Sequence, residues 1–150
     1  MFGISAFSVR FLSVLFSSMT VVVIYLTGRK FFSFQTGIFA AFIFTLSQFH
    51  MYYAHEARVY PIFVFLTALS LYFSLYICNE PKKKSSYFYL LLANILLIYS
   101  HYFGFFVIAT EFLCMFFVSN FRHIYKKMLL VFLFVKLLIN LILHFNLQLI

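Results

Sequence analysis

The chain has 150 residues, of which 65% are hydrophobic and 24% aromatic, while only 9% are charged. A soluble globular domain is about half apolar and a quarter charged, so this composition excludes that class and favours an integral membrane protein of several helices. The net charge of +8 does not indicate a nucleic-acid partner, because the basic residues cluster in short runs between apolar segments, as membrane topology signals do.

Apolar segments follow one another along the chain, at about residues 11–27, 36–53, 59–78, 86–100, 105–119 and 128–150. Helical runs of about 17–25 residues cross a bilayer. We therefore predict an all-α, polytopic membrane protein with about six transmembrane helices, forming a single transmembrane domain over residues 1–150. This arrangement puts Met1 outside and leaves no polar tail at the other end, so we expect the domain to be an internal piece of a longer protein.

The turns between these segments differ in charge. The turns after the first, third and fifth segments carry most of the basic residues: Arg29, Lys30, Lys82, Lys83, Lys84, Arg122, Lys126 and Lys127. If every segment crosses the membrane, these turns share one side, which the positive-inside rule makes cytoplasmic. The turns that contain HEAR and HYFG then share the outer side.

A polar cluster, His55-Glu56-x-Arg58-x-Tyr60, lies at the outer start of the third segment. A charge this close to the hydrocarbon costs several kcal/mol (about 3) unless it is compensated. Arg58 suits a lipid phosphate, because its guanidinium binds oxygens bidentately. Glu56 could bind a divalent metal or a sugar hydroxyl, or act as a base. A plain interfacial ion pair beside an aromatic belt explains the same residues equally well.

Two further polar features belong to the same outer side. His101 and Tyr102 follow the fourth segment and could line one cavity with HEAR, where the histidine could donate to a phosphate or bind a metal. Arg10 opens the first segment and could make another phosphate contact. The simpler alternatives are an ordinary interfacial His-Tyr pair and an arginine that extends to the lipid headgroups.

Glu111 is an acidic residue inside an apolar segment. It lies about eight residues from the inner end of the fifth segment, and Lys136 lies about eight residues into the sixth segment. At 1.5 Å per residue, both reach about the same depth. We predict a structural intramembrane salt bridge between them in preference to a proton relay, with Asn94 at a comparable level as an added hydrogen-bond partner.

The order of these motifs resembles a known family. Arg10-x-x-Ser13 opens a helix, TGRKFF and TGIFAAFIFTLS follow, and YYAHEARVY and LIYSHYFGFFV come next. This order is similar to the GT-C membrane glycosyltransferases of the protein-mannosyltransferase and ArnT-like superfamily, over about residues 7–120. The likeness is closest to bacterial glycosyltransferase family 39 and Rgt-type members, which implies a multi-pass protein of the bacterial plasma membrane with its basic turns in the cytoplasm.

The resemblance implies a hexosyltransferase that moves a sugar such as mannose from a polyprenyl-phosphate donor to a lipid, glycan or protein acceptor. Glu56 would then be catalytic and a candidate ligand for a divalent metal. Arg58 would hold the donor phosphate, with Arg10 and Tyr60 as further candidate contacts. His55, His101 and Tyr102 would belong to the same pocket. His55 stands where the family usually has Gln.

The family's acceptor-activating acidic residue, expected in a first outer loop, has no counterpart, because no Asp or Glu precedes Glu56. We therefore expect the isolated chain to have little or no transferase activity. The sequence does not identify a partner chain that would supply the missing loop. Two other classes remain open. A small multi-span transporter subunit would need polar residues spread through the membrane midplane. A non-catalytic membrane protein would tolerate the loss of Glu56 and Arg58.

Overall fold

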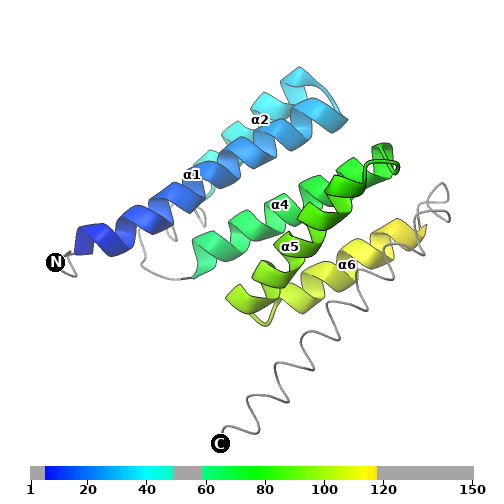
Figure 1. Ribbon diagram of the computed structural model, residues 1–150. Coiled ribbons are helices and arrows are strands. Elements are labelled where there is room, and N and C mark those ends of the chain that lie inside the picture. The colour runs from blue at the N-terminus through cyan, green and yellow to red at the C-terminus, as the bar shows by residue number, and fades with distance from the viewer. Residues whose placement is uncertain (1–5, 49–58, 118–150) are drawn as a thin grey trace, which may run out of the picture.

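The computed structural model describes residues 6–48 and 59–117, with side chains placed within 10–48 and 59–114. In these ranges the chain is helical, which confirms the predicted all-α class (Figure 1). The helices are α1 (Ala6–Phe31), α2 (Phe34–Leu46), α4 (Tyr60–Asn79), α5 (Lys84–Ser100) and α6 (Gly104–Phe117).

The bounds of α4, α5 and α6 agree with the predicted apolar segments to within a few residues, but those of α2 do not. Helix α2 ends at Leu46, and residues 49–53 of the segment predicted to continue to residue 53 lie outside the described residues. Ser47 adopts an extended backbone (φ −62°, ψ 122°), and its N–H donates to Phe44 O in a tightened last turn. At 1.5 Å per residue, the 13 residues of α2 span about 20 Å, less than the ~30 Å hydrocarbon core.

Of the five described helices, α1, α4 and α6 run in one direction and α2 and α5 in the other. The rings of Phe16 and Phe65 are 5.5 Å apart, and those of Phe31 and Tyr72 are 5.7 Å apart, so α1 and α4 are parallel neighbours. α5 returns antiparallel to α4, and α6 then packs against both (Figure 1). The starts of α1 and α4 and the α5–α6 turn therefore lie at one end, the histidine end. The α1–α2 and α4–α5 turns lie at the other, the lysine end.

The core formed by α4, α5 and α6 has layers along its axis. Next to the histidine end, Leu66, Leu97 and Ile108 form an apolar cluster. Toward the lysine end, Ile77 and Leu90 form a second apolar cluster. Between them lies a buried polar layer whose members are Ser70, Ser74, Asn94 and Glu111. A polar layer enclosed by two apolar layers must satisfy its hydrogen bonds internally, because water is excluded on both sides.

α1 and α2 pack through glycine. A Cβ added to Gly28 would lie 2.6 Å from Gly37 Cα, and one added to Gly37 would lie 2.7 Å from Tyr25 O. The two backbones are therefore in direct contact. Small residues at such a contact are typical of helix pairs in membranes, where close backbone approach replaces the hydrophobic effect as the source of stability.

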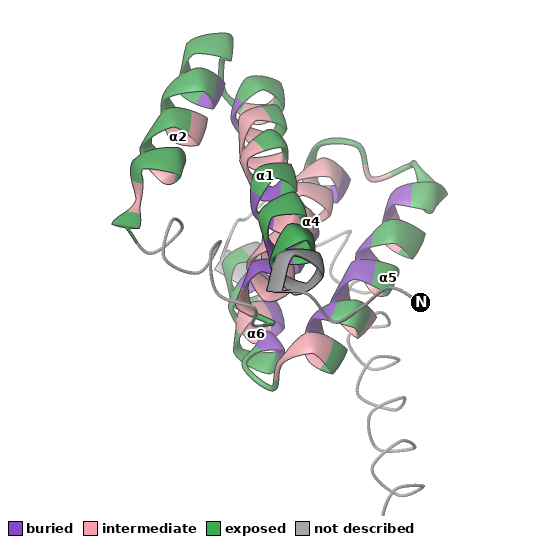
Figure 2. Ribbon diagram, turned by 90° about the vertical axis from the view of Figure 1, so that its left-hand side faces the viewer, coloured by how far each residue is buried: buried purple, intermediate pink, exposed green. Residues whose placement is uncertain are grey.

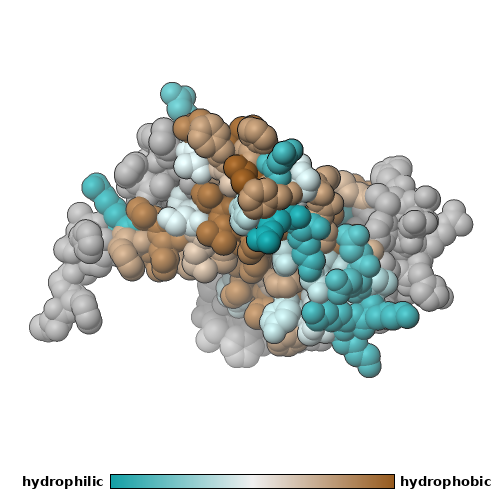
Figure 3. Space-filling model, turned by 90° about the horizontal axis from the view of Figure 1, so that it is seen from above, coloured by the Kyte–Doolittle hydropathy of each residue, from teal (hydrophilic) through white to brown (hydrophobic). Residues whose placement is uncertain are grey.

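The surface matches a lipid environment. Buried residues face inward between the helices, and the outer faces are exposed (Figure 2). The exposed face of α2 carries large apolar side chains, including Phe39, Phe42 and Ile43 at 61–68% exposure. Hydrophilic side chains gather mainly toward one side of the view in Figure 3. In the described ranges, Arg10–Phe31 and Tyr60–Asn79 are long and apolar enough to cross a membrane. The count of six spans stays a prediction.

Candidate functional site

The α5–α6 turn and the first turn of α4 meet at the histidine end. The ring of His101 lies 6.0 Å from that of Tyr60 and 5.5 Å from that of Phe63, both on α4. On its own turn it stacks on Tyr102 at 4.6 Å and on Phe103 at 5.2 Å. The sequence prediction that His101 and Tyr102 lie on the same side as the start of the third apolar segment agrees with this arrangement.

Hydrogen bonding determines which nitrogen of His101 carries the proton. The backbone N–H of Phe103 donates to His101 Nδ1 at 3.3 Å. A nitrogen that accepts a hydrogen bond is unprotonated, so the neutral ring carries its proton on Nε2. His101 is half-buried. Its Nε2–H is a donor on the other nitrogen of the ring from Nδ1, which accepts from the Phe103 N–H. This group can donate to a phosphate or hydroxyl oxygen brought to the histidine end.

The turn itself is compact. Gly104 N donates to His101 O at 2.9 Å, and a Cβ on Gly104 would lie 2.9 Å from Leu97 O. Because a side chain at this position would press on the end of α5, glycine lets α6 start directly against α5. The Gly104 backbone thus determines how closely the His101 turn follows α5.

The other predicted residues at this end differ in their surroundings. Tyr60 is half-buried in the first turn of α4 and shares its ring contact with His101. Tyr102 is 66% exposed and Arg10 is exposed on α1. Because α1 and α4 are parallel, and Phe16 faces Phe65, Arg10 lies toward the same end as Tyr60. The described contacts do not join Arg10 to His101.

The remaining predicted residues at this end, His55, Glu56 and Arg58, lie outside the described residues. Their meeting with His101 therefore stays a prediction. The chain places Arg58 two residues before the first residue of α4, whose N-terminus has no side-chain cap. The helix dipole makes such an N-terminus favourable for an anion, although Pro61 in its first turn has no N–H to donate.

Among the described residues, Glu111 has two serines of α4 as partners. Its Oε2 lies 2.9 Å from Ser70 Oγ and 3.0 Å from Ser74 Oγ, and Ser70 Oγ also lies 2.6 Å from Asn94 Oδ1. The predicted closeness of Asn94 is thus borne out through a shared serine. Lys136 lies outside the described residues, so the predicted salt bridge stays untested.

Sequence reasoning did not include Ser70 and Ser74 in this cluster. The signal was present, because the two serines are four residues apart in an otherwise apolar segment and so face the same side of a helix. Small polar residues at that spacing are common at helix contacts in membranes. Only the packing of α4 against α6 identifies Glu111 as their partner.

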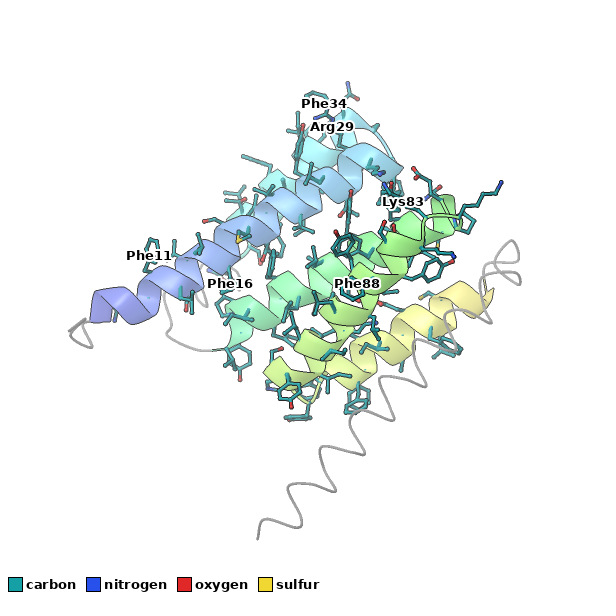
Figure 4. The ribbon with its side chains drawn as sticks, viewed as in Figure 1. Phe11, Phe16, Arg29, Phe34, Lys83 and Phe88 are labelled. Atoms are coloured by element: carbon teal, nitrogen blue, oxygen red, sulfur yellow. The ribbon has the colours of Figure 1, made fainter. Side chains whose placement is uncertain are left out.

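Basic residues gather at the lysine end, where Arg29 and Lys83 both lie (Figure 4). Lys30 Nζ lies 3.6 Å from the centre of the Tyr76 ring. Lys83 Nζ donates to the Tyr76 hydroxyl at 3.0 Å, and that hydroxyl donates to Glu80 at 2.9 Å. The basic turns that follow the first and third apolar segments therefore share one end of the bundle, as the charge pattern predicts.

The model of one protein family, described as dolichyl-phosphate-mannose-protein mannosyltransferase, matches residues 1–145. The chain belongs to this family. The match extends beyond residue 120, where the motif resemblance was expected to fade. No curated protein and no solved structure matches the chain. The family is one of membrane glycosyltransferases that draw on a dolichyl- or polyprenyl-phosphate mannose donor. Membership also supports an integral membrane location, together with the apolar helices α1 and α4.

For this member of the mannosyltransferase family, the described residues hold no group of three or more His, Cys, Asp or Glu side chains that could bind a metal. Glu56, the candidate ligand named from the sequence, lies outside the described residues. A divalent ion at Glu56 therefore stays a prediction.

Proposed function

We propose that this chain binds a polyprenyl-phosphate sugar at the histidine end. It belongs to an enzyme that transfers a hexose, such as mannose, from this donor to a lipid, glycan or protein acceptor. The observation that carries the proposal is the family match over residues 1–145, which includes the HEAR and HYFG motifs. The structure supports it by bringing the HYFG turn against the helix that follows HEAR.

Binding of the donor phosphate is assigned to cationic and donor groups near the start of α4. Arg58 would bind two phosphate oxygens through its guanidinium, and Arg10 would add charge from α1. The dipole of α4 adds partial positive charge at its N-terminus, on the same side as Tyr60. The Nε2–H of His101 would donate to the phosphate or to a sugar hydroxyl. Together, these groups favour binding of an anion beside the aromatic side chains of Tyr60 and Phe63.

The proposed reaction is a single displacement at the anomeric carbon. An acceptor oxygen forms the new bond to that carbon while the bond to the phosphate oxygen breaks, and the phosphate leaves with the electron pair. Arg58 would stabilise the charge that grows on the leaving phosphate, which is the usual role of a preorganised cation. The acceptor's proton needs a base, and Glu56 is the acidic residue that the sequence offers at this end.

A transporter receives no specific support from the described helices. The buried polar side chains that hydrogen-bond between α4, α5 and α6 gather in one layer, and the described helices are continuous through the core. Further buried hydroxyls, those of Ser13, Ser17 and Thr20, lie on α1. A transport pathway would need polar groups spread along a route across the membrane. A non-catalytic protein is distinguished by the experiment that follows.

The test is donor binding by the full chain in lipid nanodiscs, measured with polyprenyl-phosphate mannose and with the sugar-free polyprenyl phosphate. Arg58→Gln should weaken binding of both lipids about 10–100-fold, because it removes a charge-assisted hydrogen bond worth ~1.5–3 kcal/mol. His101→Phe keeps a ring but removes both nitrogens, and should cost up to about tenfold. Glu56→Gln should keep donor binding and abolish any transfer.

Arg29→Gln is the matched control, because it removes the same charge at the lysine end. It should leave donor binding unchanged. No saturable binding by the unaltered chain, or equal losses for Arg29→Gln and Arg58→Gln, would contradict the proposal and favour a non-catalytic membrane protein.

A further inference from the structure

The buried polar layer of α4, α5 and α6 has no part in the proposed transfer, yet its geometry is specific. Glu111 is 7% exposed, Ser70 is fully buried and Asn94 is 3% exposed. Each residue belongs to a different helix, and their polar atoms are within 2.6–2.9 Å of Ser70 Oγ. Ser74, one turn along α4, donates to the same Glu111 oxygen at 3.0 Å. The layer is therefore a single hydrogen-bonded unit that spans all three helices.

The number of hydrogen-bond donors constrains the protonation state of Glu111 in this unit. Ser70 has one hydroxyl hydrogen but two neighbouring oxygens, Asn94 Oδ1 and Glu111 Oε2. If Glu111 is a neutral carboxylic acid protonated at Oε2, every close pair has one donor. The Glu111 hydroxyl then donates to Ser70, Ser70 donates to Asn94 Oδ1, and Ser74 donates to Glu111 Oε2.

An ionised Glu111 fits less well. It would need the Asn94 amide turned so that Nδ2 donates to Ser70, which then donates to the carboxylate. Even so, Glu111 Oε1 is buried and has no hydrogen-bond partner among the described residues. An unbonded oxygen of a neutral acid costs much less in an apolar core than an unbonded oxygen of an anion.

The charges around Glu111 support the neutral form. α4 carries no charged residue between Tyr60 and Asn79, and α5 carries only Lys84, in its first turn. On α6, Glu111 is the sole ionisable acid or base within Gly104–Phe117, apart from the Cys114 thiol, which is exposed. No cation of the described helices is therefore within the layer to balance a carboxylate.

We propose that Glu111 is a positioning residue, a neutral acid that joins α6 to α4 and, through Ser70, to α5, and so holds His101 against the start of α4. The turn that carries His101 connects α5 directly to α6, so its position depends on how these two helices sit on α4. The relevance to catalysis rests on the proposed function, whereas the hydrogen-bond unit and its effect on His101 do not.

The first measurement is the infrared carbonyl band of a protonated carboxylic acid in the full chain at neutral pH. The chain has only three acidic residues, Glu56, Glu80 and Glu111, so the band can be assigned by substitution. We expect a band that disappears in Glu111→Gln and persists in Glu80→Gln, which removes an exposed acid. A spectrum without this band, or a band unaffected by Glu111→Gln, would overturn the proposal and favour an ionised Glu111, such as one paired with Lys136.

The second measurement follows the ring of His101 by ¹⁵N NMR of labelled histidine, with His101→Phe used for assignment. Glu111→Gln keeps a neutral group with donor and acceptor, and should leave the His101 signals unchanged. Glu111→Leu and the milder Ser70→Ala break the unit and should shift them. Thr110→Val, which alters an exposed neighbour bonded only to its own helix at Phe106 O, should have no effect.

Unchanged His101 signals in a folded Ser70→Ala protein would contradict the positioning role, whether or not Glu111→Leu folds. If donor binding fails in the unaltered chain while both spectroscopic results hold, the proposed function is wrong and the positioning unit stands.

Discussion

At the scale of single residues, the two ends of the bundle use aromatic rings for different purposes. Tyr76 receives two ammonium groups, with Lys30 Nζ 3.6 Å and Lys83 Nζ 5.2 Å from the ring centre. Its hydroxyl also links Lys83 to Glu80. At the other end, rings contact His101, and among the described residues only its Nδ1 takes part in a hydrogen bond. The first arrangement ties α1 to the α4–α5 turn, and the second presents a donor.

The Tyr76 contact predicts a pH effect. The hydrogen bond to Tyr76 raises the pKa of Lys83 above its ordinary value. A raised pKa means that the contact contributes stability while Lys83 is charged and loses that contribution as pH rises through the raised pKa. Tyr76→Phe should therefore lower the Lys83 pKa, which can be followed by ¹³C NMR of the labelled lysine.

Tyr89→Phe, an exposed tyrosine on α5, is the control for this titration. The Lys83 pKa should be the same in Tyr89→Phe as in the unaltered chain. An equal Lys83 pKa in Tyr76→Phe would show that the hydrogen bond does not act on the ammonium.

At the scale of elements, the α1–α2 pair includes a direct backbone contact, between Gly28 and Gly37. The N-terminus of α2 is capped by Ser33, whose hydroxyl accepts from Thr36 N–H at 3.1 Å. With α2 starting at this cap, Gly37 lies in direct backbone contact with Gly28 on α1. The space between α1, α2 and α4 forms an apolar groove, and Thr20, Thr27 and Thr67 turn their hydroxyls to their own helices. These threonines therefore contribute apolar surface to the groove, because their hydroxyls are bonded to backbone carbonyls.

Because of the contact between Gly28 and Gly37, we expect Gly37→Ala to destabilise the protein, whereas Gly→Ala usually stabilises a helix. In most helices, Gly→Ala stabilises by about 0.5–1 kcal/mol through backbone entropy. Here the new Cβ would lie 2.7 Å from Tyr25 O and 2.8 Å from Arg29 N, so overpacking of about 1–3 kcal/mol should dominate. Thermal unfolding in detergent should show a lower midpoint for Gly37→Ala.

The neighbouring substitution Ile38→Val serves as the control, because Ile38 is exposed on α2. Its midpoint should stay near that of the unaltered chain. A higher midpoint for Gly37→Ala would mean that α1 and α2 separate easily in detergent and that their contact contributes little.

At the scale of the whole molecule, charge and apolar surface divide along the helix axes. The basic turns after α1 and α4 share the lysine end, and the apolar outer faces lie between that end and the histidine end. A bilayer that covers the apolar faces would place the two ends on opposite sides of the membrane. From the positive-inside rule, we predict that the lysine end faces the cytoplasm.

Labelling with a membrane-impermeant maleimide tests this topology. In a chain with Cys78 and Cys114 replaced by Ser, Tyr102→Cys should react on intact cells that express the chain. Ser85→Cys, at the exposed start of α5, should react only after permeabilisation. The opposite pattern would invert the topology, and labelling of both residues from outside would mean that α5 does not cross the membrane.

The sequence by itself determined the helical class, the positions of most helices and the grouping of basic turns, because apolar run length and charge position are local properties of the chain. It also indicated the family through HEAR and HYFG, which the match over residues 1–145 bears out. These features need no knowledge of which helix faces which.

Only the tertiary structure decided the partners of the buried polar groups. Ser70 meets Asn94 and Glu111 across separations of 24 and 41 residues, and His101 meets Tyr60 and Phe63 from another helix. Such contacts depend on the rotation and relative height of packed helices, which arise from side-chain fit along the whole interface. Periodicity assigns a residue to a face, but only packing determines what that face contacts.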